Sequence, residues 1–247
     1  MKIVYTGGTG RFGKTFRKET KLKNILYPTS KEMNISNYDS VKKYLSKTKP
    51  SILIHSAALS RPMDIHDKEV GKSIDINIIG TANLVRYCFE KKIKIIYFST
   101  NYVYPGIKGK YKENNPLHPS NNYGWSKLGG ECAVQMYNKS LILRISMTEK
   151  PFIHKLAFDD MITNFTFHEN IIKLIPKLLN KTGIINIGGP IQSVYKFAKK
   201  YNPKIKSASA KKLFIKKIPI NHSMNINKLK KIIKWLNLGL MRKNISF

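Results

Sequence analysis

A tyrosine and a lysine stand four residues apart in the segment 122–131, which begins a predicted helix. Residues at this spacing share one helix face, so Tyr123 and Lys127 should lie side by side. A neighbouring ammonium stabilises phenolate and lowers a phenol pKa that is ordinarily about 10. The tyrosine could then donate or accept a proton near neutral pH. A hydroxyl from Ser99 or Thr100, at the end of a predicted strand, could hold a substrate carbonyl beside it.

The first thirteen residues contain a motif that would bring a nucleotide to this pair. An apolar strand over 3–5 is followed by Gly7, Gly10 and Gly13, which open a predicted helix. Glycine permits a tight turn and close approach of the backbone to a ligand, and a helix N-terminus favours phosphate. We therefore predict a dinucleotide site at the edge of a parallel sheet. The tyrosine–lysine spacing gains weight from this context, since a chain with 13 tyrosines could contain it by chance.

The same stretch also matches the phosphate-binding loop of NTPases, from Gly8 to Thr15. That class of protein needs an apolar strand that ends in Asp and holds Mg²⁺. The candidate strands end at His55, Ser99 and Arg144 instead. The NTPase alternative also leaves the tyrosine–lysine pair without a role, so the dinucleotide site is favoured.

Cofactor preference depends on the end of the second predicted strand, 24–27. A site for NAD usually carries an acidic residue there, which binds the ribose 2′-OH. The segment Tyr27–Lys31 holds no carboxylate, which permits the 2′-phosphate of NADP. Ser30, Lys31 and Arg11 are candidates to contact that phosphate, although Lys31 could equally be one of many exposed lysines. We predict NADP or NAD, with NADP slightly preferred.

The elements that must position these residues alternate regularly through residue 146. Because the connections are long, this alternation predicts an α/β fold with a Rossmann-type, doubly wound parallel sheet. The predicted strands are 3–5, 24–27, 51–55, 94–98 and 140–145, and the predicted helices are 11–20, one capped by Ser36, 67–90 and one that begins at Asn122. Gly80 stands inside the third helix, where close packing would explain it.

The remaining residues predict a smaller substrate-binding lobe. Residues 1–146 would form the NAD(P)-binding domain, and 147–247 a lobe that shares the same core. The stretch 148–167 shows no clear period and predicts loops over the substrate. The later elements predicted are helices over 168–180, 193–201 and 225–236 and a strand over 183–187.

Composition excludes several classes of function. The net charge is +31, but the lysines are spread along the chain, which favours a solvated basic surface over specific nucleic-acid binding. Cys88 and Cys132 lie in no metal-ligand spacing and fit a reducing cytoplasm. The six histidines lack spaced carboxylate partners, so we expect no metal. No apolar run approaches a membrane span, and the residues after Met1 already form a core strand, so we expect no signal peptide.

Seven sequence blocks stand in an order and at spacings that together are far more specific than any single block. They are residues 6–13, 55–58, 75–81, 98–106, 123–131, 143–146 and 224–229. Together they resemble the extended short-chain dehydrogenase/reductases, and within that family the dTDP-4-dehydrorhamnose reductase group of sugar-nucleotide reductases. The resemblance is good to about residue 146 and patchy afterwards.

This resemblance implies a catalytic role for Thr100, Tyr123 and Lys127. Tyr123 would protonate a sugar carbonyl oxygen as hydride arrives from the nicotinamide, and Lys127 would also hold the nicotinamide ribose. The candidate cofactor-binding residues, with the neighbours of the glycine turn included, are Gly7, Gly10, Arg11, Phe12, Gly13, Ser30, Lys31, Ala57, Ala58, Asn77 and Lys127. The candidate substrate-binding residues are Ser99, Thr100, Asn101, Tyr123 and Arg144.

Two of these positions bear on the reaction. The Arg144 guanidinium could bind a diphosphate, and a structural ion pair is the open alternative. Dehydratases of this superfamily usually follow the threonine with an acidic pair, whereas here Asn101 and Tyr102 follow it, closer to the reductase pattern.

We expect reduction of a 4-keto-6-deoxyhexose nucleotide in surface polysaccharide synthesis. The alternatives are an epimerase or dehydratase, or a non-catalytic NADP-binding regulatory subunit of the same fold. A homodimer is a further expectation.

Overall fold

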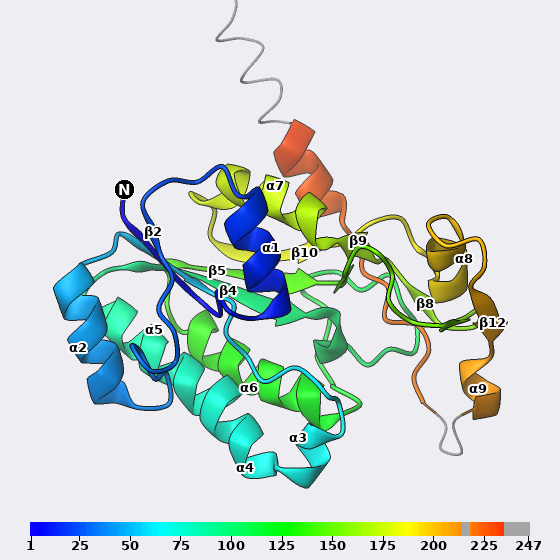
Figure 1. The fold of residues 1–247 in the computed structure, drawn as a ribbon, viewed down its shortest axis with the longest axis horizontal. Helices are drawn as coiled ribbons and strands as arrows, with labels where there is room; N and C mark the ends of the chain where they lie inside the picture. Colours follow the sequence, from blue (N-terminus) through cyan, green and yellow to red (C-terminus); the bar gives the residue numbers. More distant parts are fainter. Residues whose placement is uncertain (214–217, 235–247) are drawn as a thin grey trace, which may run out of the picture.

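A six-stranded parallel sheet forms the centre of the computed structural model, which describes residues 1–213 and 218–234 (Figure 1). The strand order is β10-β5-β4-β3-β1-β2, and every neighbouring pair is parallel. The strands are β1 (Ile3–Thr6), β2 (Ile25–Leu26), β3 (Ile52–His55), β4 (Lys94–Thr100), β5 (Ser140–Ile145) and β10 (Gly183–Ile187). The strand order reverses beside β1, where ligands bind in doubly wound sheets. The predicted Rossmann-type α/β fold is confirmed.

Helices cover both faces of this sheet, as its strands require (Figure 1). The strands are near-continuously apolar and buried, which is the pattern of a parallel sheet covered on two sides. One core cluster joins the sheet to α1 (Arg11–Glu19) and α7 (His168–Leu178). The other joins it to α2 (Tyr38–Thr48), α5 (Gly80–Glu90) and α6 (Asn122–Gln135).

The long helix predicted over 67–90 is interrupted. It consists of α3 (Ile65–Lys68), α4 (Val70–Ser73), a π-helical segment (Ile74–Ile79) and α5. π-Helical turns are rare and often occur at functional sites; this one contains the buried Asn77. Gly80 follows it, and a Cβ there would lie 2.8 Å from Ile35 Cγ1, so close packing does explain this glycine.

One predicted helix cap is wrong by a residue. Asn37, not Ser36, caps α2, because its side-chain oxygen accepts a hydrogen bond from the Ser40 N–H at 2.9 Å. The Ser36 hydroxyl instead donates to the carbonyl oxygen of Asp75 at 2.9 Å. It thereby ties the start of α2 to the π-helical segment.

Part of the chain after residue 146 returns to the central sheet. β10 pairs with β5, α7 packs on the sheet, and Leu229 belongs to the same core cluster. Residues 227–234 are helical, and the end of the helix predicted over 225–236 lies outside the described residues. The predicted helix over 168–180 corresponds to α7, and that over 193–201 to α8 (Val194–Lys199).

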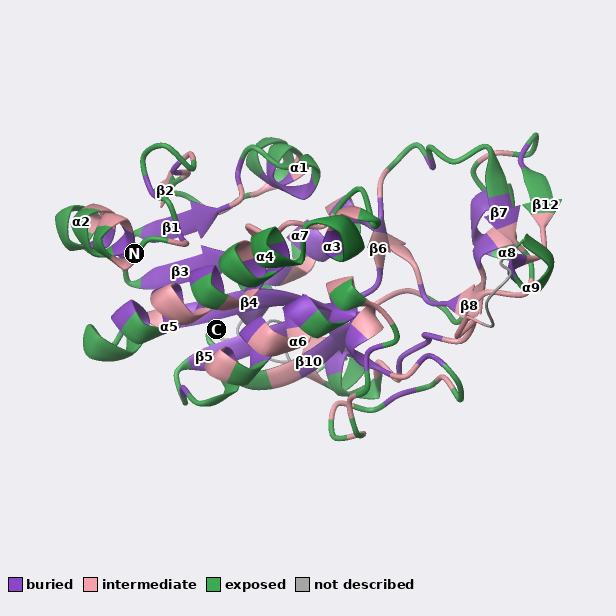
Figure 2. Cartoon of the chain, turned by 90° about the horizontal axis from the view of Figure 1, so that it is seen from below, coloured by how far each residue is buried: buried purple, intermediate pink, exposed green. Residues whose placement is uncertain are grey.

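A further, smaller cluster stands apart from the sheet (Figure 2). The prediction of loops over 148–167 is wrong, because this segment contributes short strands that pair with later ones. The pairs are β6 (Met147–Thr148) with β9 (Thr166–Phe167), β7 (Leu156–Phe158) with β12 (Lys206–Ala208), and β8 (Ile162–Thr163) with β11 (Gln192–Ser193). α8 and α9 (Ala210–Leu213) lie beside them. Two-residue strands leave too little periodicity for sequence patterns to reveal.

Among residues 1–213 and 218–234, no helix combines the length and apolarity that crossing a membrane requires. The same residues contain no group of three or more His, Cys, Asp or Glu side chains that could hold a metal ion.

Candidate active site

The candidate proton-transfer residues meet at the carboxyl edge of the sheet. Thr100 is the last residue of β4, and Tyr123 lies in the first turn of α6, which the side chain of Asn121 caps by accepting the Gly124 N–H at 2.7 Å. The Thr100 side chain lies beside the Tyr123 phenol and acts to lower its pKa. The Thr100 hydroxyl accepts the Tyr102 N–H at 3.3 Å and donates to the Asn101 Oδ1 at 3.4 Å. Lys127 follows one helical turn later and is buried. The structure thus brings Thr100, Tyr123 and Lys127 together.

Burial dominates the protonation of this group. It raises the pKa of Tyr123 to about 12, although the Thr100 side chain acts in the opposite direction. Burial also lowers the pKa of Lys127 to about 7, and the negative charge of Glu131 acts against that shift. The prediction that the lysine lowers the tyrosine pKa is therefore wrong for this arrangement. The phenol is instead held protonated at neutral pH.

A buried polar network supports Lys127 from the sheet side. Its Nζ lies 4.2 Å from the centre of the Tyr97 ring, and the Tyr97 hydroxyl donates to the Lys127 carbonyl oxygen at 3.0 Å. His55, at the end of β3, is hydrogen-bonded to the hydroxyls of Thr6 at 2.8 Å and Thr81 at 3.0 Å. Burial, assisted by the charge of Lys127, lowers the pKa of His55 to about 3. The imidazole is therefore neutral and structural, as expected from its place in the strand.

Glu131 joins α6 to the neighbouring strands. It forms a fully buried ion pair with Arg144 of β5 and accepts the Ser99 hydroxyl at 2.7 Å. Arg144 also donates to the Tyr104 hydroxyl at 2.8 Å and to the Glu113 carbonyl oxygen at 2.9 Å. The ion pair that sequence analysis left as the alternative for Arg144 is the arrangement present. Glu131 was part of a recognised motif, but its spacing gave no sign of this partner.

Three side chains predicted to contact substrate therefore point into the protein. Arg144 is 1% exposed and is held by Glu131, which also holds the hydroxyl of Ser99. The Asn101 amide donates to the His222 carbonyl oxygen at 3.2 Å. These contacts engage polar atoms of Ser99, Asn101 and Arg144 within the protein, and substrate-binding roles for the three residues stay predictions.

The glycine turn forms a cradle that only glycine can line. Gly7 has φ +84°, and a Cβ there would lie 2.6 Å from the backbone nitrogen of Ala57. A Cβ on Gly13 would lie 2.1 Å from the Gly7 carbonyl oxygen, and one on Gly10 would lie 3.3 Å from the same atom. The turn after β1 thus packs against the loop after β3 and the start of α1. This bare backbone, together with a helix N-terminus, fits a dinucleotide pyrophosphate.

Asn77 fixes the neighbouring loop, which contains Ala57 and Ala58. Its side chain exchanges two hydrogen bonds with the backbone of Leu59, at 2.8 and 2.9 Å, and donates to the Ser126 hydroxyl at 2.8 Å. Ala57 and Ala58 remain partly exposed. Asn77 is 1% exposed, and its side chain positions the loop and α6. Direct contact of Asn77 with the cofactor stays a prediction.

The remaining predicted cofactor-binding residues divide into two groups. Arg11 forms an ion pair with Glu149 at 2.8 Å, and the Phe12 ring packs in the core at 5.2 Å from that of Phe98. The side chain of Phe12 therefore cannot contact a cofactor. Ser30 and Lys31 are exposed in the turn after β2.

Sequence reasoning missed several residues around the site. Four rings form a row along one side, with centroid distances of 5.2 Å for His66–Tyr123, 6.1 Å for Tyr102–Tyr123 and 4.9 Å for Tyr102–His222. Burial raises the pKa values of both tyrosines, and the positive charge of Arg61 acts in the opposite direction. The four rings and Arg61 come from segments far apart in the sequence, so no spacing signal could have identified the group.

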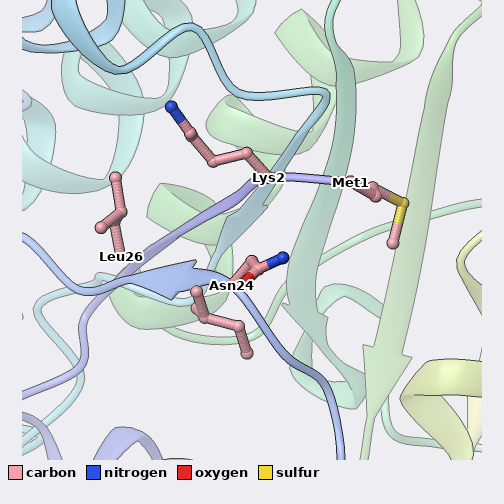
Figure 3. Close-up of a pocket in the computed structure, with 5 residues that line it drawn as sticks. Met1, Lys2, Asn24 and Leu26 are labelled. Atoms are coloured by element: carbon pink, nitrogen blue, oxygen red, sulfur yellow. The ribbon is translucent and has the colours of Figure 1, made fainter.

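A separate pocket lies at the opposite edge of the sheet (Figure 3). Met1, Lys2, Asn24, Ile25 and Leu26 line it, at the amino ends of β1 and β2. Parallel sheets of this class bind ligands at their carboxyl edge, so this pocket does not compete with the site at Tyr123.

Comparison with known proteins finds sequence similarity over somewhat more than half of the chain. The model of a family described as RmlD substrate binding domain matches residues 1–150. A dTDP-4-dehydrorhamnose reductase from Aggregatibacter actinomycetemcomitans is 32% identical over 152 residues, which cover 60% of this chain and 51% of the relative. The methionine adenosyltransferase 2 subunit beta of Xenopus laevis is 31% identical over 155 residues, covering 58% of this chain and 46% of the relative. The chain thus spans about half the length of the curated relatives it matches.

Solved structures extend the similarity over most of the chain. A dTDP-4-dehydrorhamnose reductase from Bacillus anthracis, solved in complex with NADP, superposes with a TM-score of 0.83 at 26% identity, covering 93% of this chain and 91% of that one. An orthologue from Clostridium acetobutylicum has a TM-score of 0.81 at 22% identity and covers 96% and 100%, respectively. The second likeness supports the fold alone.

Proposed function

The chain belongs to the RmlD substrate binding domain family, and on that premise we propose that it is an NAD(P)-dependent reductase of a nucleotide-linked sugar. The observation that carries the proposal is the contact of Thr100 with Tyr123, one helical turn from Lys127 and at the sheet edge that holds the glycine cradle. The proposed substrate is a 4-keto-6-deoxyhexose nucleotide, since a relative 32% identical to the chain is a dTDP-4-dehydrorhamnose reductase.

The protonation of the site suits reduction. A bound nicotinamide would supply hydride to the carbonyl carbon, which leaves a proton to be given to the carbonyl oxygen. Tyr123 carries that proton at neutral pH, because burial raises its pKa to about 12. Thr100 lies beside the phenol and acts to lower its pKa. Lys127, with its pKa lowered by burial to about 7, is charged in a substantial fraction of molecules and would hold the nicotinamide ribose.

Purified protein tests this proposal directly. We expect oxidation of NADPH or NADH by dTDP-4-keto-6-deoxy sugars, followed at the nicotinamide absorbance. Replacing Tyr123 with Phe should lower kcat about 10²- to 10⁴-fold, the usual contribution of a positioned proton donor, while cofactor affinity stays unchanged. Turnover that survives this substitution would refute the proton-donor role.

A second candidate is a non-catalytic dinucleotide-binding subunit. It is favoured by the similarity to methionine adenosyltransferase 2 subunit beta and opposed by the retained Thr100, Tyr123 and Lys127. Cofactor binding without turnover of any keto sugar would support it. Epimerisation or dehydration would appear as sugar products formed without net cofactor oxidation. A homodimer and a cytoplasmic location stay predictions, which light scattering and cell fractionation can test.

A further inference from the structure

Three residues from different elements meet beside the glycine turn. The Arg17 guanidinium of α1 lies 4.4 Å over the centre of the Tyr27 ring, and its Nη2 donates to the Tyr27 carbonyl oxygen at 3.2 Å. A Cβ on Gly8 would lie 2.9 Å from the Tyr27 ring and 3.1 Å from Arg17 Nε. The guanidinium is therefore fixed between the glycine turn and the exit of β2.

This place is where a Rossmann-type site distinguishes NAD from NADP. The adenine ribose of a bound dinucleotide lies at the end of the second strand, and its 2′ position carries a hydroxyl in NAD and a phosphate in NADP. β2 ends at Leu26, directly before Tyr27. A guanidinium has five N–H donors in one plane, so stacking on a ring and one bond to a carbonyl leave donors for a phosphate.

The carboxylate of Glu32 is engaged by its own turn. Glu32 accepts hydrogen bonds from the backbone N–H and the hydroxyl of Thr29, at 2.8 and 2.9 Å. These bonds, with a contribution from the charge of Arg17, lower the pKa of Glu32. Its charge is thus held within its own turn, and the acidic residue that would bind the ribose hydroxyls in an NAD site has no counterpart at the end of β2.

We propose that Arg17 binds the 2′-phosphate of NADP and makes this site select NADP over NAD. The inference rests on the proposed dinucleotide-binding function and deepens it. Of the candidates expected from the sequence, Arg11 is engaged by Glu149, and Ser30 and Lys31 lie exposed in the turn beyond Tyr27. They would add to the phosphate site from its outer side, whereas Arg17 is already oriented by Tyr27. A planar fork held in this way matches phosphate oxygens better than a flexible ammonium does.

The test is a binding titration that does not require turnover. Isothermal titration of the full chain would measure the affinities of NADPH, NADH, 2′,5′-ADP and 5′-AMP. In Arg17→Gln we expect NADPH and 2′,5′-ADP to bind about 10- to 100-fold more weakly, the loss typical of charge-assisted hydrogen bonds. NADH and 5′-AMP should bind as they do to the unchanged chain. The NADPH affinity of Arg17→Lys should lie between those of Arg17→Gln and the unchanged chain. Lysine keeps the positive charge but lacks the planar set of N–H donors.

Lys18→Gln is the matched control, since Lys18 is an exposed cation of the same helix. It should leave all four affinities unchanged, and thermal melting would verify that each variant is folded. The proposal is overturned if Arg17→Gln weakens NADPH and NADH equally, if it changes neither, or if Lys31→Gln alone removes the preference. NADPH binding lost selectively in Arg17→Gln without turnover of any keto sugar would uphold this inference and refute the proposed reaction. A chain that binds none of the four ligands would refute both.

Discussion

Lys127 and Glu131 occupy successive turns of α6 but have different partners. Lys127 contacts the ring of Tyr97, and burial lowers its pKa to about 7 against the opposing charge of Glu131. Glu131 is fully paired with Arg144 and Ser99. The first can change its protonation during a reaction, whereas the second holds α6 against β4 and β5.

Removal of the Glu131 charge should strongly destabilise the protein. In Glu131→Gln the buried guanidinium of Arg144 loses its counter-ion, and breaking a buried pair costs about 3–5 kcal/mol. For a chain of this size the expected fall in Tm is roughly 6–20 °C. Glu69→Gln is the matched control, because Glu69 pairs with Lys72 at the exposed surface and should hardly change Tm. Equal melting temperatures for the two variants would contradict the structural role of Glu131.

At the residue scale, sequence patterns predicted which residue types meet but not which way each side chain points. Tyr123 and Thr100 could be placed together because the end of one strand and the start of the next helix share a sheet edge. Arg144 could not be assigned, since the choice between a ligand and Glu131 depends on which side of β5 faces α6. Arg17 was missed because a cation on an exposed helix face has no distinguishing spacing in a chain with 45 lysines and arginines.

At the scale of elements, the turn between β1 and α1 has the tightest steric requirement. The Cβ of an alanine at position 13 would lie 2.1 Å from the Gly7 carbonyl oxygen and 2.7 Å from the Gly8 Cα. These neighbours are backbone atoms, which cannot move aside without opening the turn. The cradle for the pyrophosphate therefore depends on this glycine.

Gly13→Ala should consequently weaken NADPH binding at least about tenfold, since even 1.4 kcal/mol of distortion has that effect. A fall in Tm should accompany it. Gly71→Ala provides the control, because a Cβ at Gly71 of α4 meets nothing within 4 Å, so that affinity should be unchanged and helix stability slightly raised. A Gly13→Ala protein that binds NADPH normally in a fluorescence titration would exclude the proposed cradle.

Element order could be predicted because parallel strands and covering helices have distinct apolar patterns. The interruption of the helix after β3 could not, because the i→i+5 hydrogen bonds of a π-helical segment have no signature in residue type. The short strands over 147–167 were missed for a related reason. Their pairing partners lie between residues 166 and 208, and strands of two or three residues have no measurable period.

For the whole molecule, the net charge of +31 acts against compactness. Exposed charges repel over about 8 Å at physiological ionic strength, and salt screens that repulsion. We expect Tm to rise as NaCl increases from about 0.02 to about 0.3 M, where a balanced protein would change little. An equal osmolarity of sucrose is the control for general solvent effects. A Tm that falls with NaCl would mean that attractive surface pairs outweigh the repulsion.

Stability should also rise between pH 7 and about pH 8.5, for a reason that salt does not remove. The pKa of Lys127 is about 7 in the folded chain and about 10.4 when unfolded. Within this window the unfolded chain therefore holds more protons at this site, and the free energy of unfolding increases with pH. The gain is about 2 kcal/mol across the window, or roughly 4–8 °C in Tm.

The rise in stability ends near about pH 8.5 because burial raises the pKa of Cys88 in the folded chain. Above that pH the thiol ionises in the unfolded chain, which opposes folding. Comparison with Lys127→Met separates the contribution of Lys127 from that of the net charge. At about 0.3 M NaCl, the Tm of the unchanged protein should still rise between pH 7 and about pH 8.5, whereas the Tm of Lys127→Met should not. If the Tm of Lys127→Met rises with pH as in the unchanged protein, other groups cause the pH dependence. Burial then does not lower the pKa of Lys127 to about 7.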